Sequence, residues 1–344
     1  MRLDNIGDVI MTSPALRAIK ENLPDCRITL MASPSGAQAA PLLPWVDEVL
    51  PWRVLWQDLG QLDFAPAREW ELVRTLRDRH FDAAIIFTSF NQTPHPAGFL
   101  CYLAGIPLRL GESKEVGGAV LTTEVVAAPD EIHQVERNLR LLEVAGFAVS
   151  DRSLSIQISV AAQQEATLCL AQHGIGAGAP YILLNPWTSC QSRNYDSQRF
   201  AAAARQLALH TSWPIVVTGV AKDRDRSGTL MEVLSPHAID LIGTTRLPQL
   251  AALIANAQLV LTNNTSTMHL ADATRTKSVI LFAGTEYESQ WRPRNSPSRL
   301  LRRPTPCSPC YAFTCPYNLE CLDIPPEEVV AAGLELLKDY ADRN

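Results

Sequence analysis

Short apolar runs rich in β-branched residues alternate with longer amphipathic stretches along most of this chain. The alternation predicts β-α-β units, in which helices cover a parallel sheet. In the second half, five buried strands are predicted, at residues 181–184, 215–218, 239–241, 259–262 and 278–282. Helices are predicted between them, at residues 197–210, 227–234, 247–255 and 266–273. The pattern therefore indicates the α/β class with parallel sheets.

The first half has the same pattern with fewer clear strands. Strands are predicted at residues 27–31, 83–87 and 119–126, and helices at residues 9–22, 69–79 and 133–145. Parallel domains normally begin with a buried strand, yet residues 1–3 alone precede the first turn. We therefore expect either a clipped first strand or a start that lies further upstream.

Length and hydrophobic content indicate two domains. The chain has 344 residues, 47% of them hydrophobic, which is more than one ordinary core needs. We place an N-terminal domain at residues 1–155 and a C-terminal domain at residues 156–325. The last segment, residues 326–344, follows two prolines and reads as a helix. We expect this helix to pack back on the N-terminal domain.

Charge and hydropathy exclude two classes of protein. The formal net charge is -6, which argues against a general nucleic-acid binder because such proteins usually carry a basic excess. No stretch approaches the roughly 18 apolar residues of a membrane span, and the N-terminus lacks the apolar region of a signal peptide. We therefore expect a soluble, unexported protein that binds no nucleic acid.

Four of the eight cysteines lie close together, at Cys307, Cys310, Cys315 and Cys321. A C-x2-C pair with two further cysteines could hold a structural zinc ion, and redox-inert thiols are the alternative. The other four are scattered singly, unlike a secreted disulfide framework. In either case the loop is expected to be architectural, and no catalytic metal is predicted.

The first candidate for chemistry is Asp8, in the turn Asn5-Ile6-Gly7-Asp8. A turn between a strand and a helix lies at the carboxyl edge of a parallel sheet, where open α/β folds bind their ligands. Aspartate is also a common helix cap. The sequence leaves both interpretations open.

Polar residues also follow strands in the second half. Thr188, Ser189 and Arg193 follow the strand at 181–184, and a cation with hydroxyl groups suits a phosphate. The alternative is a polar surface loop. Asp223 follows the strand at 215–218, where acidic residues often hold ribose hydroxyls. A solvated charged loop is the alternative there.

A further polar run lies between the strand at 259–262 and the next helix. Its candidate residues are Asn264, Thr265, Ser266 and His269. The unpaired N–H groups at a helix start and the helix dipole favour an anion. Helix caps and a core histidine are the alternatives, and the joint position of two such sites favours a ligand.

These motifs resemble those of glycosyltransferase family 9, the ADP-heptose:lipopolysaccharide heptosyltransferases and their relatives. The resemblance rests on residues 2–17 (RLDNIGDVIMTSPALR), on Asn185-Pro186 with residues 192–195 and Phe200, and on residues 263–271 (NNTSTMHLA). It implies a GT-B fold, with two Rossmann-like domains that face a central cleft. It also implies an inverting, metal-independent sugar transfer that needs no cofactor.

The resemblance implies a role for each candidate residue. Asp8 would be the general base, Arg193 with Thr188 and Ser189 would hold the diphosphate, and Asp223 would contact the ribose. Asn264, Thr265, Ser266 and His269 would cradle the donor. The segment Asn264-Thr265-Ser266 stands where many members have Asp-Ser/Thr-Gly, which leaves the donor sugar open.

The partners implied by the resemblance are ADP-heptose and a lipopolysaccharide core or related surface-glycan acceptor. A cytoplasmic enzyme with peripheral contact at the inner membrane face is therefore expected. Two alternatives remain: a catalytically silent, nucleotide-binding relative, and another GT-B enzyme such as a nucleotide-sugar epimerase.

Overall fold

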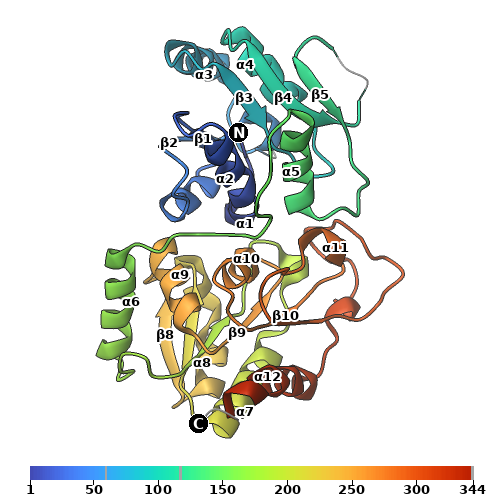
Figure 1. Ribbon diagram of the computed structural model, residues 1–344. Coiled ribbons are helices and arrows are strands. Elements are labelled where there is room, and N and C mark those ends of the chain that lie inside the picture. Colours follow the sequence, from blue (N-terminus) through green and yellow to red (C-terminus); the bar gives the residue numbers. More distant parts are fainter. Residues whose placement is uncertain (59, 116–117, 342–344) are drawn as a thin grey trace. The chain divides into compact units, whose positions relative to one another are not determined.

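The computed structural model describes residues 1–58, 60–115 and 118–341 (Figure 1). The chain forms two compact units, Met1–Leu154 and Ser155–Asn344. Each unit is an α/β domain whose strands pair in parallel, which confirms the predicted fold class. Among the residues described, no helix is long and apolar enough to cross a membrane.

The C-terminal unit is built on one six-stranded parallel sheet with the order β11-β10-β9-β6-β7-β8. The strands are β6 (Ile182–Asn185), β7 (Ile215–Gly219), β8 (Ala238–Ile242), β9 (Leu259–Asn263), β10 (Ser278–Leu281) and β11 (Ser298–Leu301). Five of them were predicted. The edge strand β11 was missed because its residues are half-buried or exposed and form no apolar run. Counted along the chain the order is 3-2-1-4-5-6, so the strand order reverses between β6 and β9.

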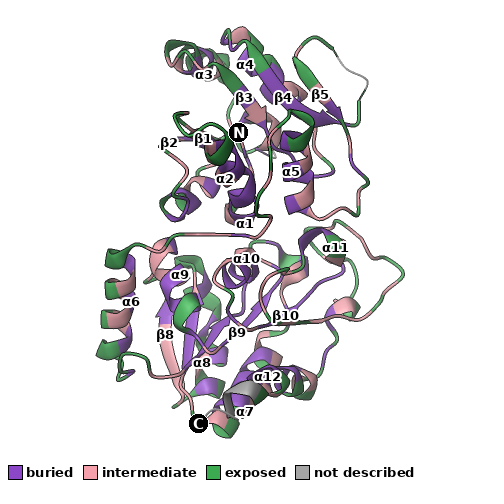
Figure 2. Cartoon of the chain, in the orientation of Figure 1, coloured by how far each residue is buried: buried purple, intermediate pink, exposed green. Residues whose placement is uncertain are grey.

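Helices cover this sheet at α6 (Val160–Gln172), α7 (Ser197–Thr211), α8 (Gly228–Leu234), α9 (Leu247–Asn256), α10 (Ser266–Ala273), α11 (Glu288–Trp291) and α12 (Pro326–Ala341). Short 3-10 turns lie at Gln191–Arg193, Ala221–Arg226 and Glu320–Leu322. The strands β6, β9 and β10 are buried along their length (Figure 2).

The C-terminal helix α12 packs within the C-terminal unit, against α7, β10 and β11. We expected it on the N-terminal domain. Val329 and Leu336 instead join the buried cluster of the C-terminal sheet. A Cβ atom added at Gly333 would lie 3.0 Å from Leu207 and 3.1 Å from Leu259, so the helix approaches α7 and the sheet closely at this position.

The N-terminal unit repeats this strand order. Its strands are β1 (Thr29–Ala32), β2 (Glu48–Pro51), β3 (Ala83–Ile86), β4 (Leu108–Ser113) and β5 (Thr123–Val126). The first residues lie between β1 and β3: Arg2 pairs with Ala32, and the Phe87 N–H donates to the Met1 carbonyl at 3.0 Å. This segment therefore acts as a very short first strand. The spatial order is then β2, β1, the first segment, β3, β4 and β5. Counted along the chain with the first segment as strand 1, this is again 3-2-1-4-5-6, and the order reverses between the first segment and β3.

Helices of this unit are α1 (Ile6–Ile10), α2 (Ser13–Asn22), α3 (Pro66–Asp78), α4 (His95–Leu103) and α5 (Gln134–Val144), with 3-10 turns at Gly36–Leu42 and Leu55–Gln57. The single helix predicted at 9–22 is two helices, because Pro14 has no N–H for the carbonyl of Ile10. The strand β4 was missed because Arg109 and Glu112 interrupt its apolar pattern, although both are buried.

Candidate active site

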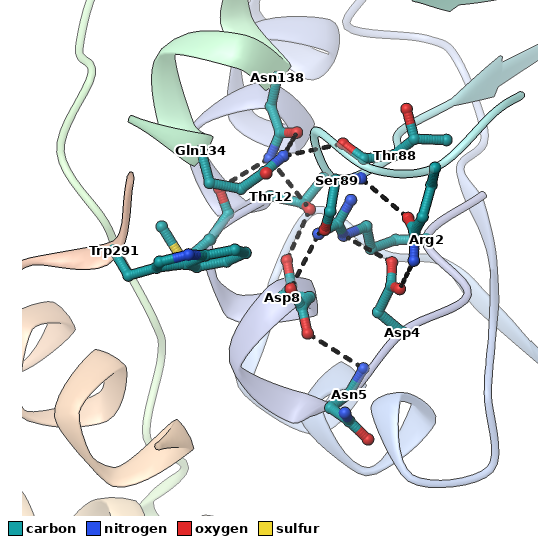
Figure 3. Close-up of polar contacts among 12 residues, drawn as sticks. Arg2, Asp4, Asn5, Asp8, Thr12, Thr88, Ser89, Gln134, Asn138 and Trp291 are labelled. Carbon is teal, nitrogen blue, oxygen red and sulfur yellow. Dashed lines mark hydrogen bonds and ion pairs between the residues drawn. The ribbon is translucent and has the colours of Figure 1, made fainter. Parts of the chain in front are cut away.

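Asp8 lies on the short helix α1, directly after the first strand of the N-terminal unit (Figure 3). Its Oδ2 accepts the backbone N–H of Asn5 at 3.2 Å, and its Oδ1 accepts a hydrogen bond from Arg2 Nη2 at 2.9 Å. The side chain nevertheless remains 17% exposed. The helix-capping contact is thus present, and it leaves part of the carboxylate open to an incoming group.

The guanidinium of Arg2 is fully buried behind Asp8. Its Nη2 also donates to Ser89 Oγ at 2.9 Å, and its Nε lies 3.3 Å from Asp4 Oδ2. Gln92 Nε2 donates to Asp4 Oδ1 at 2.5 Å. Burial raises the pKa of Asp4, as does the charge of Asp8, whereas Arg2 and Gln92 act in the opposite direction. The sequence analysis did not predict the contacts of Arg2 with Asp4, Asp8 and Ser89, because a charged residue in so short a strand has no apolar pattern around it.

A second set of polar side chains fixes the break between α1 and α2. Thr12 Oγ1 donates to the Asp8 carbonyl at 2.9 Å, and Asn138 Nδ2 donates to the Met11 carbonyl at 3.2 Å. Gln134, which is also on α5, donates to Asn138 Oδ1 at 2.9 Å and to the Thr88 carbonyl at 3.0 Å. These buried contacts join α1, α5 and the end of β3, and so fix the helix that carries Asp8 (Figure 3).

In the C-terminal unit, the site residues gather where β6 and β9 end. Asn185 and Thr262 are paired in the sheet, so the two loops that follow begin side by side. Asn263 Nδ2 donates to the Pro186 carbonyl at 2.7 Å, and its Oδ1 accepts the Tyr195 N–H at 3.1 Å. The buried amide of Asn263 therefore fixes both ends of the loop at 186–195.

That loop carries Thr188, Ser189 and Arg193. The Thr188 N–H donates to Asn194 Oδ1 at 2.7 Å, and its hydroxyl donates to the Cys190 carbonyl at 2.6 Å, whereas Ser189 is exposed. Arg193 Nη2 donates to Glu286 Oε1 at 2.6 Å, and its Nε donates to Thr285 Oγ1 at 3.2 Å.

The residues Thr285 and Glu286 follow β10 and were not predicted. The rule that polar residues at strand ends mark a ligand site would have found them, because the predicted strand at 278–282 ends just before them. The geometry thus adds a fourth strand end to the three that the sequence indicated in this unit.

The segment that follows β9 contributes amide and hydroxyl groups. Asn264 is buried, its Oδ1 accepts the Ala283 N–H at 3.1 Å, and its buried Nδ2 has no hydrogen-bond partner among the residues described. Thr265 and Ser266 are half-buried where α10 begins. His269 is buried one turn later, and its ring centre lies 6.3 Å from that of Trp291 in an edge-on contact.

Asp223 is buried in the 3-10 turn Ala221–Arg226 that follows β7, and its carboxylate is hydrogen-bonded within that turn and to the residue that precedes it. Its Oδ2 accepts the Val220 N–H at 2.9 Å, and its Oδ1 accepts a hydrogen bond from Arg226 Nη2 at 2.6 Å. Arg226 also lies over the Trp187 ring, 5.3 Å from its centre. Asp223 is therefore held rigidly, and both of its oxygens already have donors.

The cysteine loop is free of disulfides, since all four of its cysteines are free thiols. Within the described part of the chain, no group of three or more His, Cys, Asp or Glu residues is arranged to hold a metal ion. The loop is anchored instead by its backbone: the Cys310 N–H donates to the Gly284 carbonyl and the Tyr311 N–H to the Thr285 carbonyl. Burial raises the pKa of the Cys321 thiol. These contacts support the strand end that carries Glu286.

Comparisons with known proteins agree with this architecture. The sequence model of glycosyltransferase family 9 (heptosyltransferase) matches residues 69–320, which is more than half of the chain. The chain belongs to this family. It is therefore a glycosyltransferase.

Relatives within glycosyltransferase family 9 match across most of the chain. Lipopolysaccharide heptosyltransferase 2 of Salmonella typhimurium is 26% identical over 292 residues, which cover 80% of each protein. Two solved structures share the fold. The family 9 glycosyltransferase of Veillonella parvula has a TM-score of 0.80 at 19% identity, covering 98% of this chain and 96% of that one. The ADP-heptose lipopolysaccharide heptosyltransferase II of Escherichia coli has a TM-score of 0.76 at 22% identity, covering 99% and 98%. The fold is GT-B, with two Rossmann-like domains.

Proposed function

We propose that this glycosyltransferase transfers heptose from ADP-heptose to a lipopolysaccharide core or a related surface glycan, with Asp8 as the general base. The donor and acceptor class are those named for its relatives in Salmonella typhimurium and Escherichia coli. The observation that carries the proposal is the carboxylate of Asp8, which is oriented by Arg2 and Asn5 yet remains partly exposed at a strand end.

The chemistry follows from a carboxylate in this position. Asp8 accepts the proton of an acceptor hydroxyl as that oxygen attacks the anomeric carbon of the donor sugar. The bond between the anomeric carbon and the diphosphate oxygen breaks, and ADP leaves with the electron pair. Attack from the face opposite the leaving group inverts the anomeric configuration.

The C-terminal unit supplies the donor site in this proposal. Arg193, with Thr188 and Ser189, stabilises the charge that develops on the departing diphosphate. Asn264, with its unpaired buried Nδ2, and the half-buried Thr265 and Ser266 would contact the donor where α10 begins. His269 completes that segment, and Asp223 would accept a hydrogen bond from the ribose.

A glycolipid acceptor would also determine the cellular location of the enzyme. We place it in the cytoplasm, in peripheral contact with the inner membrane face where such an acceptor is exposed. Sedimentation of the purified protein with vesicles that contain the acceptor, but not with vesicles that lack it, would support this placement. A protein that sediments with neither kind of vesicle would contradict it.

Replacement of Asp8 tests the base directly. For Asp8→Asn we expect kcat for transfer to fall by roughly 10²- to 10⁴-fold, because the amide cannot accept the proton. Calorimetric affinity for ADP-heptose should be unchanged, since the donor residues lie in the other unit. Asp25→Asn, at an exposed position, is the matched control and should keep its kcat. Near-normal transfer by Asp8→Asn would exclude Asp8 as the base, and product formed without an acceptor would instead indicate an epimerase.

A further inference from the structure

The N-terminal unit contains a buried charged group that the proposed chemistry does not yet use. Arg2 is 0% exposed, and a buried charge is costly unless it is paired. Replacement by an apolar side chain of similar volume is often neutral or stabilising in protein cores. Packing alone therefore does not explain why a charged guanidinium occupies this buried position.

The contacts of Arg2 all lie at the carboxyl edge of the sheet. One nitrogen, Nη2, donates both to Asp8 Oδ1 and to Ser89 Oγ, each at 2.9 Å. The adjacent Nε faces Asp4 Oδ2 at 3.3 Å, and Gln92 holds the other oxygen of Asp4. A continuous chain of contacts thus leads from the loop after β3, through Asp4 and Arg2, to a single oxygen of Asp8 (Figure 3).

This geometry controls the rotation of the Asp8 side chain. Arg2 fixes Oδ1, and the Asn5 N–H fixes Oδ2, so the carboxylate plane is held at two points. Charge-assisted hydrogen bonds are the stronger kind, and a planar guanidinium directs them more narrowly than an ammonium does. A base held in this way can face an acceptor hydroxyl without first losing rotational freedom.

We propose that Arg2 is a positioning residue for Asp8, and that Asp4 and Gln92 hold Arg2 in the orientation this requires. The inference rests on the proposed role of Asp8 as the base. Arg2 touches no substrate in this scheme. It holds the carboxylate in a fixed orientation, and the loop after β3 contributes to that orientation through Gln92 and Ser89.

A double-mutant cycle tests the inference. We expect Arg2→Met to lower kcat by about 10- to 100-fold with little change in the KM for ADP-heptose, because misaligned catalytic groups lose rate on this scale. In the Asp8→Asn background the same substitution should lower kcat less than about twofold, since residues that act through one another are not additive. Arg2→Lys should recover part of the loss, and Asp4→Asn should show a smaller loss than Arg2→Met.

Arg109→Met is the matched control. Arg109 is a buried arginine of the same unit, but it lies at the start of β4 and donates to the carbonyls of Pro107 and Val120. Its loss should reduce stability without lowering kcat per folded molecule. If Arg2→Met does not fold, Arg2→Lys takes its place in the cycle.

The outcomes separate the two proposals. Normal transfer by Asp8→Asn would overturn the assignment of the base and, with it, this inference. If Asp8→Asn is impaired but Arg2→Met lowers kcat by the same factor in both backgrounds, the base stands and the positioning role of Arg2 is overturned. An Arg2→Met protein with normal kcat would overturn it as well.

Discussion

The two units share one strand order and differ in what they place at the reversal. In the C-terminal unit the strands beside the reversal, β6 and β9, are followed by hydroxyl and amide groups and by Arg193, which pairs with Glu286 after β10. In the N-terminal unit the first strand carries the buried Arg2 and is followed instead by the carboxylates of Asp4 and Asp8, which both lie against that arginine. In the proposed function, the same backbone arrangement would present hydrogen-bond donors to an anion in one unit and a proton acceptor in the other.

If the proposed roles hold, a single topology serves both halves of the transfer reaction. Parallel strands bring loops that are distant in sequence to one edge, whatever residues those loops carry. The chemistry then depends on which side chains are held there and on how each charge is paired. The side chain of Arg193 is 28% exposed, whereas that of Arg2 is fully buried. A ligand can more readily compete for the first pair than for the second.

After the replacement of Asp8, removal of the donor-side cation gives the largest expected effect. For Arg193→Ala we predict a fall in kcat/KM of roughly 10²- to 10³-fold, with weaker binding of ADP-heptose, because a preorganised donor to the developing charge is lost. Arg193→Lys should lose less. Arg199→Ala, which removes a surface pair with Asp323, is the control. An unchanged calorimetric affinity for ADP-heptose would count against the diphosphate contact.

Truncation in the two cores tests whether the units are stabilised separately. Leu207 and Leu72 are each fully buried, one in each unit. Either change to alanine should lower the free energy of unfolding by about 2–5 kcal/mol through lost burial and a cavity. Hydrogen exchange should show reduced protection in the unit that carries the change. Equal loss in both units after either substitution would show that the cores are not separate.

The smallest effect concerns the charge of Asp4. Because burial raises the pKa of Asp4 above its ordinary value of 3.8, the folded state holds this proton more tightly than the unfolded state does. Between these two pKa values the unfolding free energy of the natural protein should fall as pH rises. The Asp4→Asn variant lacks this contribution, so the natural protein should lose stability relative to the variant with rising pH. Urea unfolding across that range measures the difference, and the opposite slope would contradict the assignment.

Much of the fold could be predicted because burial leaves a direct trace in the sequence. The central strands of the C-terminal sheet are buried on both faces, so each contains an apolar run, ILL in β6, LVL in β9 and VIL in β10. The strands β4 and β11 have no such apolar run. Arg109 and Glu112 are buried through hydrogen bonds to partners that are not adjacent in sequence, and an edge strand needs fewer apolar residues.

The candidate site also has one part that the sequence predicts and one part that it does not. Strand-end position was enough to select Asp8, Arg193 and Asn264, since their loops are defined by neighbouring strands. The contacts of Arg2 with Ser89 and Asp4 depend on which strands lie side by side, and the pairing of Arg193 with Glu286 depends on the same information. Local patterns could not supply it. The roles of these residues in transfer therefore stay predictions until the variants are measured.

The interior position of β6 and β9 also determines which part of the C-terminal unit opens last. Each of these strands is hydrogen-bonded on both sides, whereas β8 and β11 form the edges of the sheet. Amide protons of central strands exchange most slowly, because their release requires opening of the surrounding structure. Asn185, Asn263 and the loops that follow them are thus attached to the region expected to exchange most slowly, so fraying at either edge strand should leave the proposed donor site intact.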